Sequence, residues 1–498
     1  GLIQVTTDGG KNWRKIELDD IKGIPATAYV NDIRADLYDP NTVYVALDNH
    51  KYGDFKPYLI KSTNLGKKWT SLADDLPGDH LVWRIVQDHV NKDLLFIGTE
   101  FGVFFTVDGG EQWVELEGGI PTISTRDVQI QRRENDLVVG TFGRGIYILD
   151  DYGPLRSIDK DALDEDALLF APSRPTKWFS MDRNHTRTDG NDRYAAKNPE
   201  HGATLTYYLK DSRLTDKEVR QQAEKEMVKD EDYPLYPAWE SIEAENQQAK
   251  PAIYVEITDS QGEVVNRLAA ATKKGLHRIT WDMTYAPLSA IAKVKEDGQG
   301  NSMMAPPGTY TATLFERVDG VIKQLAAPVA VTLEAIFEPA LQGPSSAATL
   351  AFNQSLMAAD RRFSSASEVL KALQASMATV RAAINNTPGD ISELEAQYAQ
   401  LDAELHSIYN AMFGLKSRDR MGIKPASISS RLWFSMSAAW SSYGPTAQHM
   451  EQFGYAEKGI NEVVARIKAV QDSQLPALQN AIIDAGGPWT AGASVIAD

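Results

Sequence analysis

Three acidic residues of this chain could take part in acid–base chemistry: Asp48, Glu100 and Asp127. Each lies beside a short apolar run, where a carboxylate would stand at the end of a β-strand. Hydrolysis of a glycosidic bond needs two carboxylates that face each other across a cleft, roughly 5–10 Å apart. The sequence contains no HExxH, GxSxG or phosphate-binding glycine loop. A glycoside hydrolase is therefore the catalytic hypothesis, and a partner acid could lie outside this chain.

A second group of residues suits binding rather than bond cleavage. It combines arginine, aromatic and polar side chains, which together recognise sugars or peptide carboxylates. The group comprises Asn49, His50, Trp83, Arg84, Arg126 and Arg144. The alternative interpretation is that Arg34, Arg84 and Arg126 form salt bridges along a channel and contact no ligand.

A repeated turn would position both groups. The pattern Ser/Thr-x-Asp/Asn-x-Gly-x-x-Trp occurs at residues 6–13, 62–69 and 106–113, and we call these three segments the repeat turns. The Asp or Asn side chain accepts hydrogen bonds from turn amides, and glycine adopts the backbone angles that other residues resist. Trp then packs between adjacent sheets. We expect a structural role for the turn residues Asp8, Asn64 and Asp108 and for the buried residues Trp13, Trp69 and Trp113.

The spacing of the repeat turns predicts a β-propeller. Asn64 and Asp108 are 44 residues apart, and short β-rich runs such as 43–47, 95–99 and 137–141 lie between polar turns. Such a period with several strands per unit is typical of propeller blades. The loops from second to third strands share a face with the starts of the inner strands. This face would carry the candidate residues, including a long loop from Asp48 to Pro57.

Three regions follow one another along the chain. Residues 1–152 are predicted to be the C-terminal blades of a propeller. Residues 153–340 have short strands with Gly/Pro turns and read as a linker and an immunoglobulin- or fibronectin-like β-sandwich, with a charged helical insertion at about 213–248. Residues 345–485 have apolar positions at helical spacing and predict an antiparallel helical bundle. The fold class is mainly β with an α C-terminal region.

The composition of the chain excludes several classes of partner and of binding site. The chain has 498 residues and a formal net charge of −17, which argues against nucleic acid and anionic membranes. It has no cysteine, so disulfides and thiolate metal sites are excluded. No segment approaches the roughly 18 apolar residues of a membrane-spanning helix. We expect no cofactor and no metal.

Several motifs together resemble one family. The repeat turns are similar to the Asp-box, or BNR repeat, of sialidase-like and sortilin-like propellers. With the segments 143–151, 275–282 and 307–310, they resemble large exported bacterial proteins labelled sortilin-like or BNR-repeat "glycosyl hydrolase". The resemblance implies an extracellular, cell-surface or periplasmic protein. It also implies a scaffold-like function, in which the propeller face binds a peptide, protein or glycan, with glycoside hydrolysis as the alternative.

The first blade is expected to be incomplete. Gly1 aligns with Gly102, in the middle of a blade, so the two inner strands before it are missing. We therefore expect this chain to be the C-terminal part of a longer protein. Residues 1–18 would pair with an N-terminal propeller segment of the same precursor, on the same or a separate chain, and some catalytic carboxylates could lie in those blades.

Overall fold

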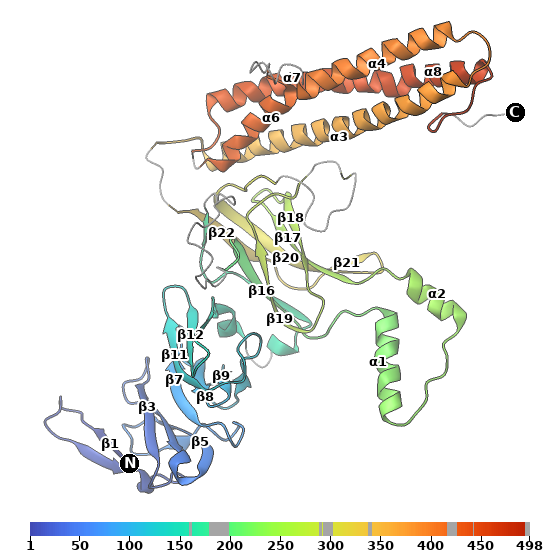
Figure 1. Ribbon diagram of the computed structural model, residues 1–498. Helices are drawn as coiled ribbons and strands as arrows, with labels where there is room; N and C mark the ends of the chain where they lie inside the picture. The colour runs from blue at the N-terminus through green and yellow to red at the C-terminus, as the bar shows by residue number, and fades with distance from the viewer. Residues whose placement is uncertain are drawn as a thin grey trace.

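The computed structural model describes residues 1–158, 162–178, 199–287, 291, 302–336, 341–415, 426–441 and 443–493. A series of small sheets comes first, then a pair of larger packed sheets, then a group of long helices (Figure 1). The helices lie at the opposite end of the molecule from the N-terminal sheets, with the paired sheets between them. The predicted fold class, mainly β with an α C-terminal region, is confirmed.

The N-terminal sheets are propeller blades in which each strand pairs antiparallel with the next. A hairpin comes first, formed by β1 (Leu2–Val5) and β2 (Arg14–Glu17). Two four-stranded blades follow: β3 (Tyr29–Ala35), β4 (Val43–Asn49), β5 (Asp54–Ser62) and β6 (Thr70–Ser71), then β7 (Val82–Gln87), β8 (Leu95–Thr99), β9 (Gly102–Thr106) and β10 (Val114–Glu115). A three-stranded blade ends the series, with β11 (Thr125–Gln131), β12 (Asp136–Thr141) and β13 (Ile146–Leu149).

The three repeat turns have the same pattern of hydrogen bonds. In the first, the Asp8 carboxylate accepts the backbone N–H of Asn12 at 2.9 Å, and the Thr6 hydroxyl accepts the N–H of Gly10 at 2.9 Å. Hydrogen bonds from Asn12 and Thr6 lower the pKa of Asp8 to about 2. The same kind of contact recurs in the other two turns: Asn64 accepts from the backbone N–H groups of Lys67 and Lys68, and Asp108 accepts from those of Glu111 and Gln112.

The tryptophans of the repeat turns are not equally buried, which corrects the expectation for Trp13. Trp113 is 7% exposed and donates its indole N–H to the Leu72 carbonyl of the preceding blade at 2.7 Å. Trp69 is half-buried against the β1–β2 hairpin. Trp13 is 55% exposed. Trp69 and Trp113 pack against the blade before their own, and the described residues include no sheet in that position for Trp13.

The β1–β2 hairpin packs against the next blade on its other face. Ile3 and Ile16 are buried together with Val45, Leu47 and Ile60 of the β3–β6 blade. Within the described residues, β1 pairs only with β2. Burial of Ile3 explains why the hairpin holds its position, and a segment that would pair with the other edge of β1 stays a prediction.

A buried carboxylate holds the end of the propeller to the segment that leaves it. Asp88 accepts hydrogen bonds from the Tyr152 hydroxyl at 2.6 Å and from Nε and Nη2 of Arg156 at 3.0 and 2.8 Å. Burial raises the pKa of Asp88, but these hydrogen bonds outweigh it and hold the pKa below its usual value. Tyr152 and Arg156 flank or lie in the short helix η3 (Gly153–Ser157). Arg278 of the following domain also donates to the carbonyl oxygens of Asp150 and Asp151.

The middle region is a β-sandwich. One sheet has the order β14 (Ala167–Phe170), β16 (Ala203–Leu209) and β19 (Gly275–Trp281). The other has the order β15 (Thr176–Trp178), β22 (Val329–Ala335), β20 (Gly308–Val318), β17 (Ala252–Thr258) and β18 (Val264–Ala270), and β21 (Val321–Gln324) also pairs with β20. All pairs are antiparallel except β15 with β22. Trp281, Tyr207 and Val255 are among the residues that fill the space between the sheets.

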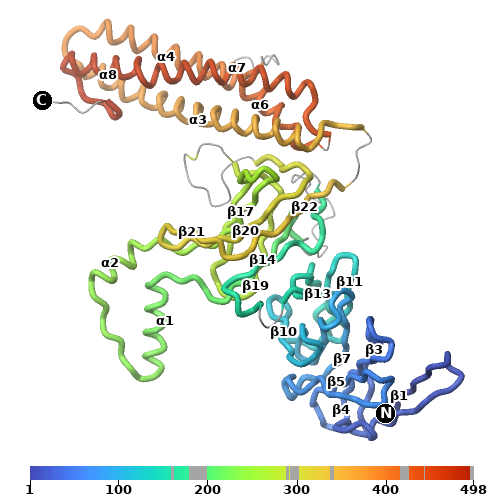
Figure 2. The backbone as a smooth tube through the Cα atoms, turned by 180° about the vertical axis from the view of Figure 1, so that it is seen from behind, coloured from blue at the N-terminus to red at the C-terminus, as the bar shows by residue number. Residues whose placement is uncertain are grey.

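The charged insertion leaves the sandwich as an arm of two helices, as Figure 2 shows from behind. They are α1 (Asp216–Lys229), which begins with a capping box from Thr215 and Glu218, and α2 (Trp239–Gln247). Arg220 of α1 bonds both oxygens of Glu245 on α2 at 2.7 and 2.8 Å, which ties the two helices together. The segment between the helices exposes several large apolar side chains, Tyr233, Leu235 and Tyr236.

The C-terminal helices form an elongated bundle. They are α3 (Ser346–Asn385), α4 (Ser392–Phe413), α6 (Ile428–Met436) with η5 (Ser437–Trp440), α7 (Ala447–Ala469) and α8 (Leu475–Asp484). The sequence predicts one helix over about 451–483, and α7 continues into α8 through a π-turn, η6 (Val470–Gln474), in which the backbone stays helical. Pro476 explains the π-turn, because proline has no N–H to donate and its ring clashes with the carbonyl four residues earlier. Within the part of the chain that the structure describes, no helix is both long and apolar enough to cross a bilayer.

Candidate ligand-binding face of the propeller

The blade strands bring most of the sequence-predicted residues to one face of the propeller. Asp48 and Asn49 end β4, while Trp83 and Arg84 lie near the start of β7. Glu100 follows β8 directly, and Arg126 belongs to the first residues of β11. The predicted long loop is instead short, because β4 extends to Asn49 and β5 starts at Asp54. Its sharp turn uses the helix η2 (His50–Tyr52) and Gly53, whose φ of 73° favours glycine.

Trp83 is the centre of a compact group on this face, which we call the Trp83 cluster: His50, Trp83, Glu100, Ser124, Arg126 and Phe142. The indole N–H of Trp83 donates to Glu100 Oε2 at 2.9 Å. The Arg126 guanidinium lies 3.7 Å above the centre of the Trp83 ring, and the His50 ring meets it edge-on at 5.8 Å. Trp83 is only 9% exposed as a result. The most accessible groups of the cluster are Arg126 and the strongly exposed Phe142, whose ring lies 5.6 Å from the guanidinium.

Each of the three candidate catalytic acids has a partner. Glu100 accepts from Trp83 and from the Ser124 hydroxyl at 3.0 Å, and it lies 3.5 Å from Arg126. Asp48 is buried and pairs with the imidazole of His50. Asp127 lies 2.9 Å from Arg84. Each of these carboxylates is therefore engaged with a neighbouring side chain of the same face.

Two of the arginines form a ladder along the inner strands. Asp32 of β3 is buried and lies 3.0 Å from Arg34 and 3.1 Å from Arg84 of the next blade. Arg84 also reaches Asp127 of the third blade, in an ion pair without hydrogen-bond geometry. The ladder links three consecutive blades through side-chain charges. This arrangement supports the alternative interpretation, a structural role, for Arg34 and Arg84.

The remaining two predicted residues differ in their surroundings. Asn49 is buried, accepts a hydrogen bond from the Thr27 hydroxyl at 2.8 Å and donates to Asp54 at 3.2 Å. Its amide therefore joins neighbouring strands. Arg144 lies in the β12–β13 turn and is exposed.

Sequence reasoning missed part of the face. Tyr29 at the start of β3 is exposed and was not among the predicted residues, whereas the exposed Tyr52 and Phe55 lie within the predicted loop from Asp48 to Pro57. The Nζ of Lys51 lies 5.5 Å from the centre of the Tyr29 ring. The signal for Tyr29 was available in the register, because Tyr29 pairs with Asp48, which the loop assignment already placed on this face. Ser124 carried no such signal, since a lone serine before a strand is common.

Comparison with known proteins returns no family model and no curated protein that matches this chain. Among solved structures, YCF48 bound to D1 peptide is 17% identical, with a TM-score of 0.23, and the alignment covers 30% of this chain and 45% of that one. PorZ, a surface component of the type-IX secretion system of Porphyromonas gingivalis, is 12% identical, with a TM-score of 0.26 and coverages of 66% and 41%. The GH74 xyloglucanase of Xanthomonas campestris is 13% identical, with a TM-score of 0.25 and coverages of 69% and 54%.

These similarities are too low to carry a conclusion about function, and the chain matches only about half or less of each of those three proteins. The class of protein follows instead from the strand order and the site. The chain combines propeller blades, a β-sandwich and a helical bundle, and one face of the blades gathers arginine and aromatic side chains.

Proposed function

We propose that this protein is a binding protein, and that the propeller face takes peptide or glycan ligands that carry a carboxylate. The observation that carries the proposal is the position of Arg126. Its guanidinium is stacked on Trp83 and flanked by Phe142, yet its side chain is nearly half exposed. Stacking fixes the plane of the guanidinium, so that its outer N–H groups are available for a bidentate contact with a carboxylate.

Exposed aromatic rings support the same proposal. Phe142, Tyr52 and Tyr29 offer apolar faces beside the cations Lys51 and Arg126. Rings of this kind stack on sugars or cover apolar side chains of a peptide.

Hydrolysis is the less favoured function on this geometry. A glycosidase needs one carboxyl group that stays protonated and a second that is free to act on the substrate or a water. Asp48, Glu100 and Asp127 each contact a basic side chain of the face instead, so none of them is free to act on a substrate or a water.

An array experiment tests the proposal. Wild type, Arg126→Gln and Phe142→Ala would be applied to acidic glycans and to peptides with free C-terminal carboxylates, with sugar release measured in the same wells. Loss of a charge-assisted contact should weaken binding about tenfold or more for Arg126→Gln. Phe142→Ala tests the aromatic contribution at a position too exposed to affect folding.

Arg133→Gln is the matched control, since Arg133 is exposed in the β11–β12 turn at the opposite end of the same strands. Its binding should equal that of the wild type. Equal binding by Arg126→Gln, or release of sugar by the wild type, would count against a binding function at this face.

We further propose that the protein is an exported, sortilin-like BNR-repeat protein whose ring contains further blades of the same precursor. Apolar side chains at both ends of the blade series support this: Leu2 and Trp13 at one end, Ile146 and Ile148 at the other, are exposed. A photo-cross-linking amino acid in place of Ile148 in the native precursor should capture another propeller blade. Cross-links only to residues of the segment described above would contradict the proposal.

A further inference from the structure

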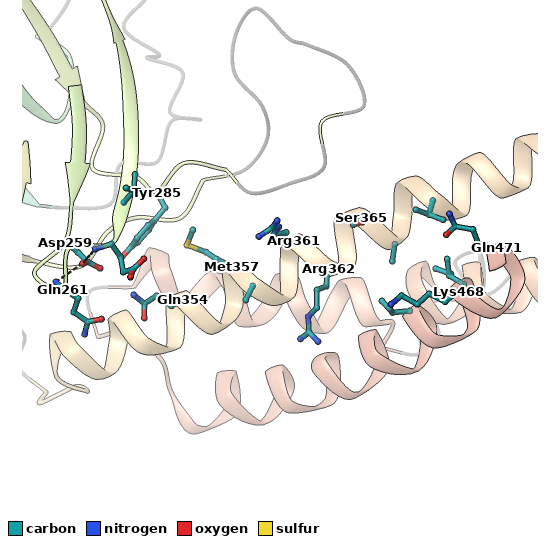
Figure 3. A pocket seen from close by; sticks show the side chains of 17 residues that line it. Asp259, Gln261, Tyr285, Gln354, Met357, Arg361, Arg362, Ser365, Lys468 and Gln471 are labelled. Carbon is teal, nitrogen blue, oxygen red and sulfur yellow. Dashed lines mark hydrogen bonds between the residues drawn. The ribbon is translucent and has the colours of Figure 1, made fainter. Parts of the chain in front are cut away.

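A groove of about 980 Å³ lies between the sandwich and the helical bundle. The β17–β18 hairpin and Tyr285 close one end, and α3 and α7 form the sides, as Figure 3 shows. Its lining includes the apolar side chains Met357, Val464 and Ile467. The groove is separate from the propeller face, so it was not part of the function proposed above.

A buried carboxylate oxygen at the sandwich end of the groove has no partner. Asp259 is 5% exposed, and its Oδ1 accepts the N–H groups of Gln261 and Glu263 at 2.9 and 3.0 Å, which shapes the hairpin turn. Its Oδ2 is buried and receives no hydrogen bond from any described residue. An asparagine would make the same turn, so the turn explains one oxygen of Asp259 and leaves the second, charged one unexplained.

A second buried polar atom lies beside it. Tyr285 is 4% exposed, and its hydroxyl has no hydrogen-bond partner among the described residues. Burial, and then the charge of Asp259, raise the pKa of Tyr285, so the phenol stays neutral and keeps an oxygen that can accept a hydrogen bond. Buried polar groups are rarely left unsatisfied, and two of them at one end of a groove indicate a missing donor.

The helical sides of the groove carry the opposite charge. Arg361 of α3 and Lys468 of α7 are exposed, whereas the neighbouring Arg362 already bonds Asn461 and Glu457. Gln471 of the π-turn also faces the groove. Turns of this type are frequent at functional sites, because they displace one side chain from the regular helical path. The groove is therefore acidic at the hairpin and basic along the helices.

We propose that this groove binds the amino-terminal end of an extended peptide. The terminal ammonium donates to Asp259 Oδ2 and Tyr285 Oη, which supplies the missing donor. Apolar side chains of the peptide lie on Met357, Val464 and Ile467, and an acidic side chain reaches Arg361 or Lys468. A simple amine fits less well because the basic sides would repel it, and a sugar fits less well because the described lining offers no exposed aromatic ring.

A peptide library tests this without a known sequence. Randomised hexapeptides without lysine and arginine carry their only ammonium at the amino terminus. Wild-type protein should retain members rich in Asp or Glu after the first positions. N-acetylation of the same library should reduce retention at least tenfold, because it removes the charge that Asp259 needs.

Variants of Asp259 and Tyr285 test whether these two buried residues are responsible for peptide retention. Asp259→Asn keeps the turn bonds of Oδ1 and should lose retention as fully as acetylation does, with no further loss on the acetylated library. Without peptide, its melting temperature should be equal to or above that of the wild type, because an unpaired buried charge is removed. Tyr285→Phe should reduce retention severalfold, and Arg361→Gln should abolish the preference for acidic members.

Asp319→Asn, in the β20–β21 turn outside the groove lining, is the matched control and should retain peptides like the wild type. The proposal is overturned if the wild type retains no peptides, if acetylated peptides are retained equally well, or if Asp259→Asn retains the library unchanged. Loss of retention by Asp259→Asn together with a fall in its melting temperature would mean a structural role and would also overturn it.

Discussion

The repeat turns at Asp8 and Asp108 have the same local structure, but their tryptophans have opposite surroundings. In both turns the carboxylate accepts the N–H group four residues later, and a Thr hydroxyl accepts a glycine N–H. Trp113 nevertheless packs into the preceding blade, while Trp13 stands largely in solvent.

This difference shows that the repeat pattern combines two features with separate causes, the backbone structure of the turn and the burial of its tryptophan. The polar residues of the turn determine its backbone, since all their partners lie within a few residues. Burial of tryptophan depends on another sheet, which the turn does not supply. The repeat is therefore a reliable sign of a hairpin, and its stabilising effect depends on the neighbouring blade.

Trp113→Ala should have the largest effect on this comparison. Removing a buried indole leaves a cavity between the β3–β6 and β7–β10 blades and should lower the opening free energy of the latter by about 3–5 kcal/mol. Hydrogen exchange followed by mass spectrometry, on peptides from β7 to β10, measures this local free energy. Unchanged protection would show that the indole does not hold the two blades together.

Asp108→Ala should have a smaller and more local effect. It removes the acceptor of two turn amides, Glu111 and Gln112, at a cost of about 1 kcal/mol. Exchange should become faster in the turn and change little in β7 and β8. Asp8→Ala should likewise speed exchange at Asn12, and a result confined to one of the two turns would contradict their equivalence.

Acid should weaken the first turn at an unusually low pH. The pKa of Asp8 is lowered from 3.8 to about 2 by hydrogen bonds, first that from the backbone of Asn12. A lowered pKa means that the charged form stabilises the turn above about pH 4, and that this contribution is lost as the pH falls through about 2. An NMR titration of the Asn12 amide should show its midpoint near 2. A midpoint near 4 would mean that the turn is not formed in solution.

Trp13→Ala should have the smallest effect. The exposed ring makes one hydrogen bond, from its N–H to the Gly10 carbonyl at 3.0 Å. We expect a change within about 0.5 kcal/mol in the opening free energy of the β1–β2 hairpin, as for other surface substitutions. A loss as large as that of Trp113→Ala would remove the contrast between the two turns.

Much of the fold was predictable because local patterns determine it. The repeat turns and β-rich runs located the blades, and the spacing of Leu356, Leu370 and Met377 located α3. The helix at about 451–483 was predicted as well, but the π-turn that it contains before Pro476 was not. The parallel pairing of β15 with β22 joins residues about 157 apart, and no local signal reports such a contact.

The candidate site was predicted as a set of residues but not as a geometry. The positions of Trp83, Glu100 and Arg126 at strand ends and starts placed them on one face, yet the stacking of Arg126 on Trp83 depends on two different blades. The same limit applies to Asp259: a turn at 260–262 is readable from the sequence, but the hydrogen bonds of Asp259 and its unpartnered oxygen are visible only in the folded structure. The geometry of both candidate sites is therefore set by contacts between segments that are distant in the sequence.

The joint at Asp88 has a mechanical consequence. Arg156 and Tyr152 donate hydrogen bonds to this buried carboxylate, and Phe170 of the sandwich shares an apolar core with Phe96 of the propeller. Bending the chain at this point would break several of these contacts at once, so the contacts oppose a hinge between the blades and the sandwich. A force on the sandwich would therefore be passed on to the propeller face with little change in the angle between them.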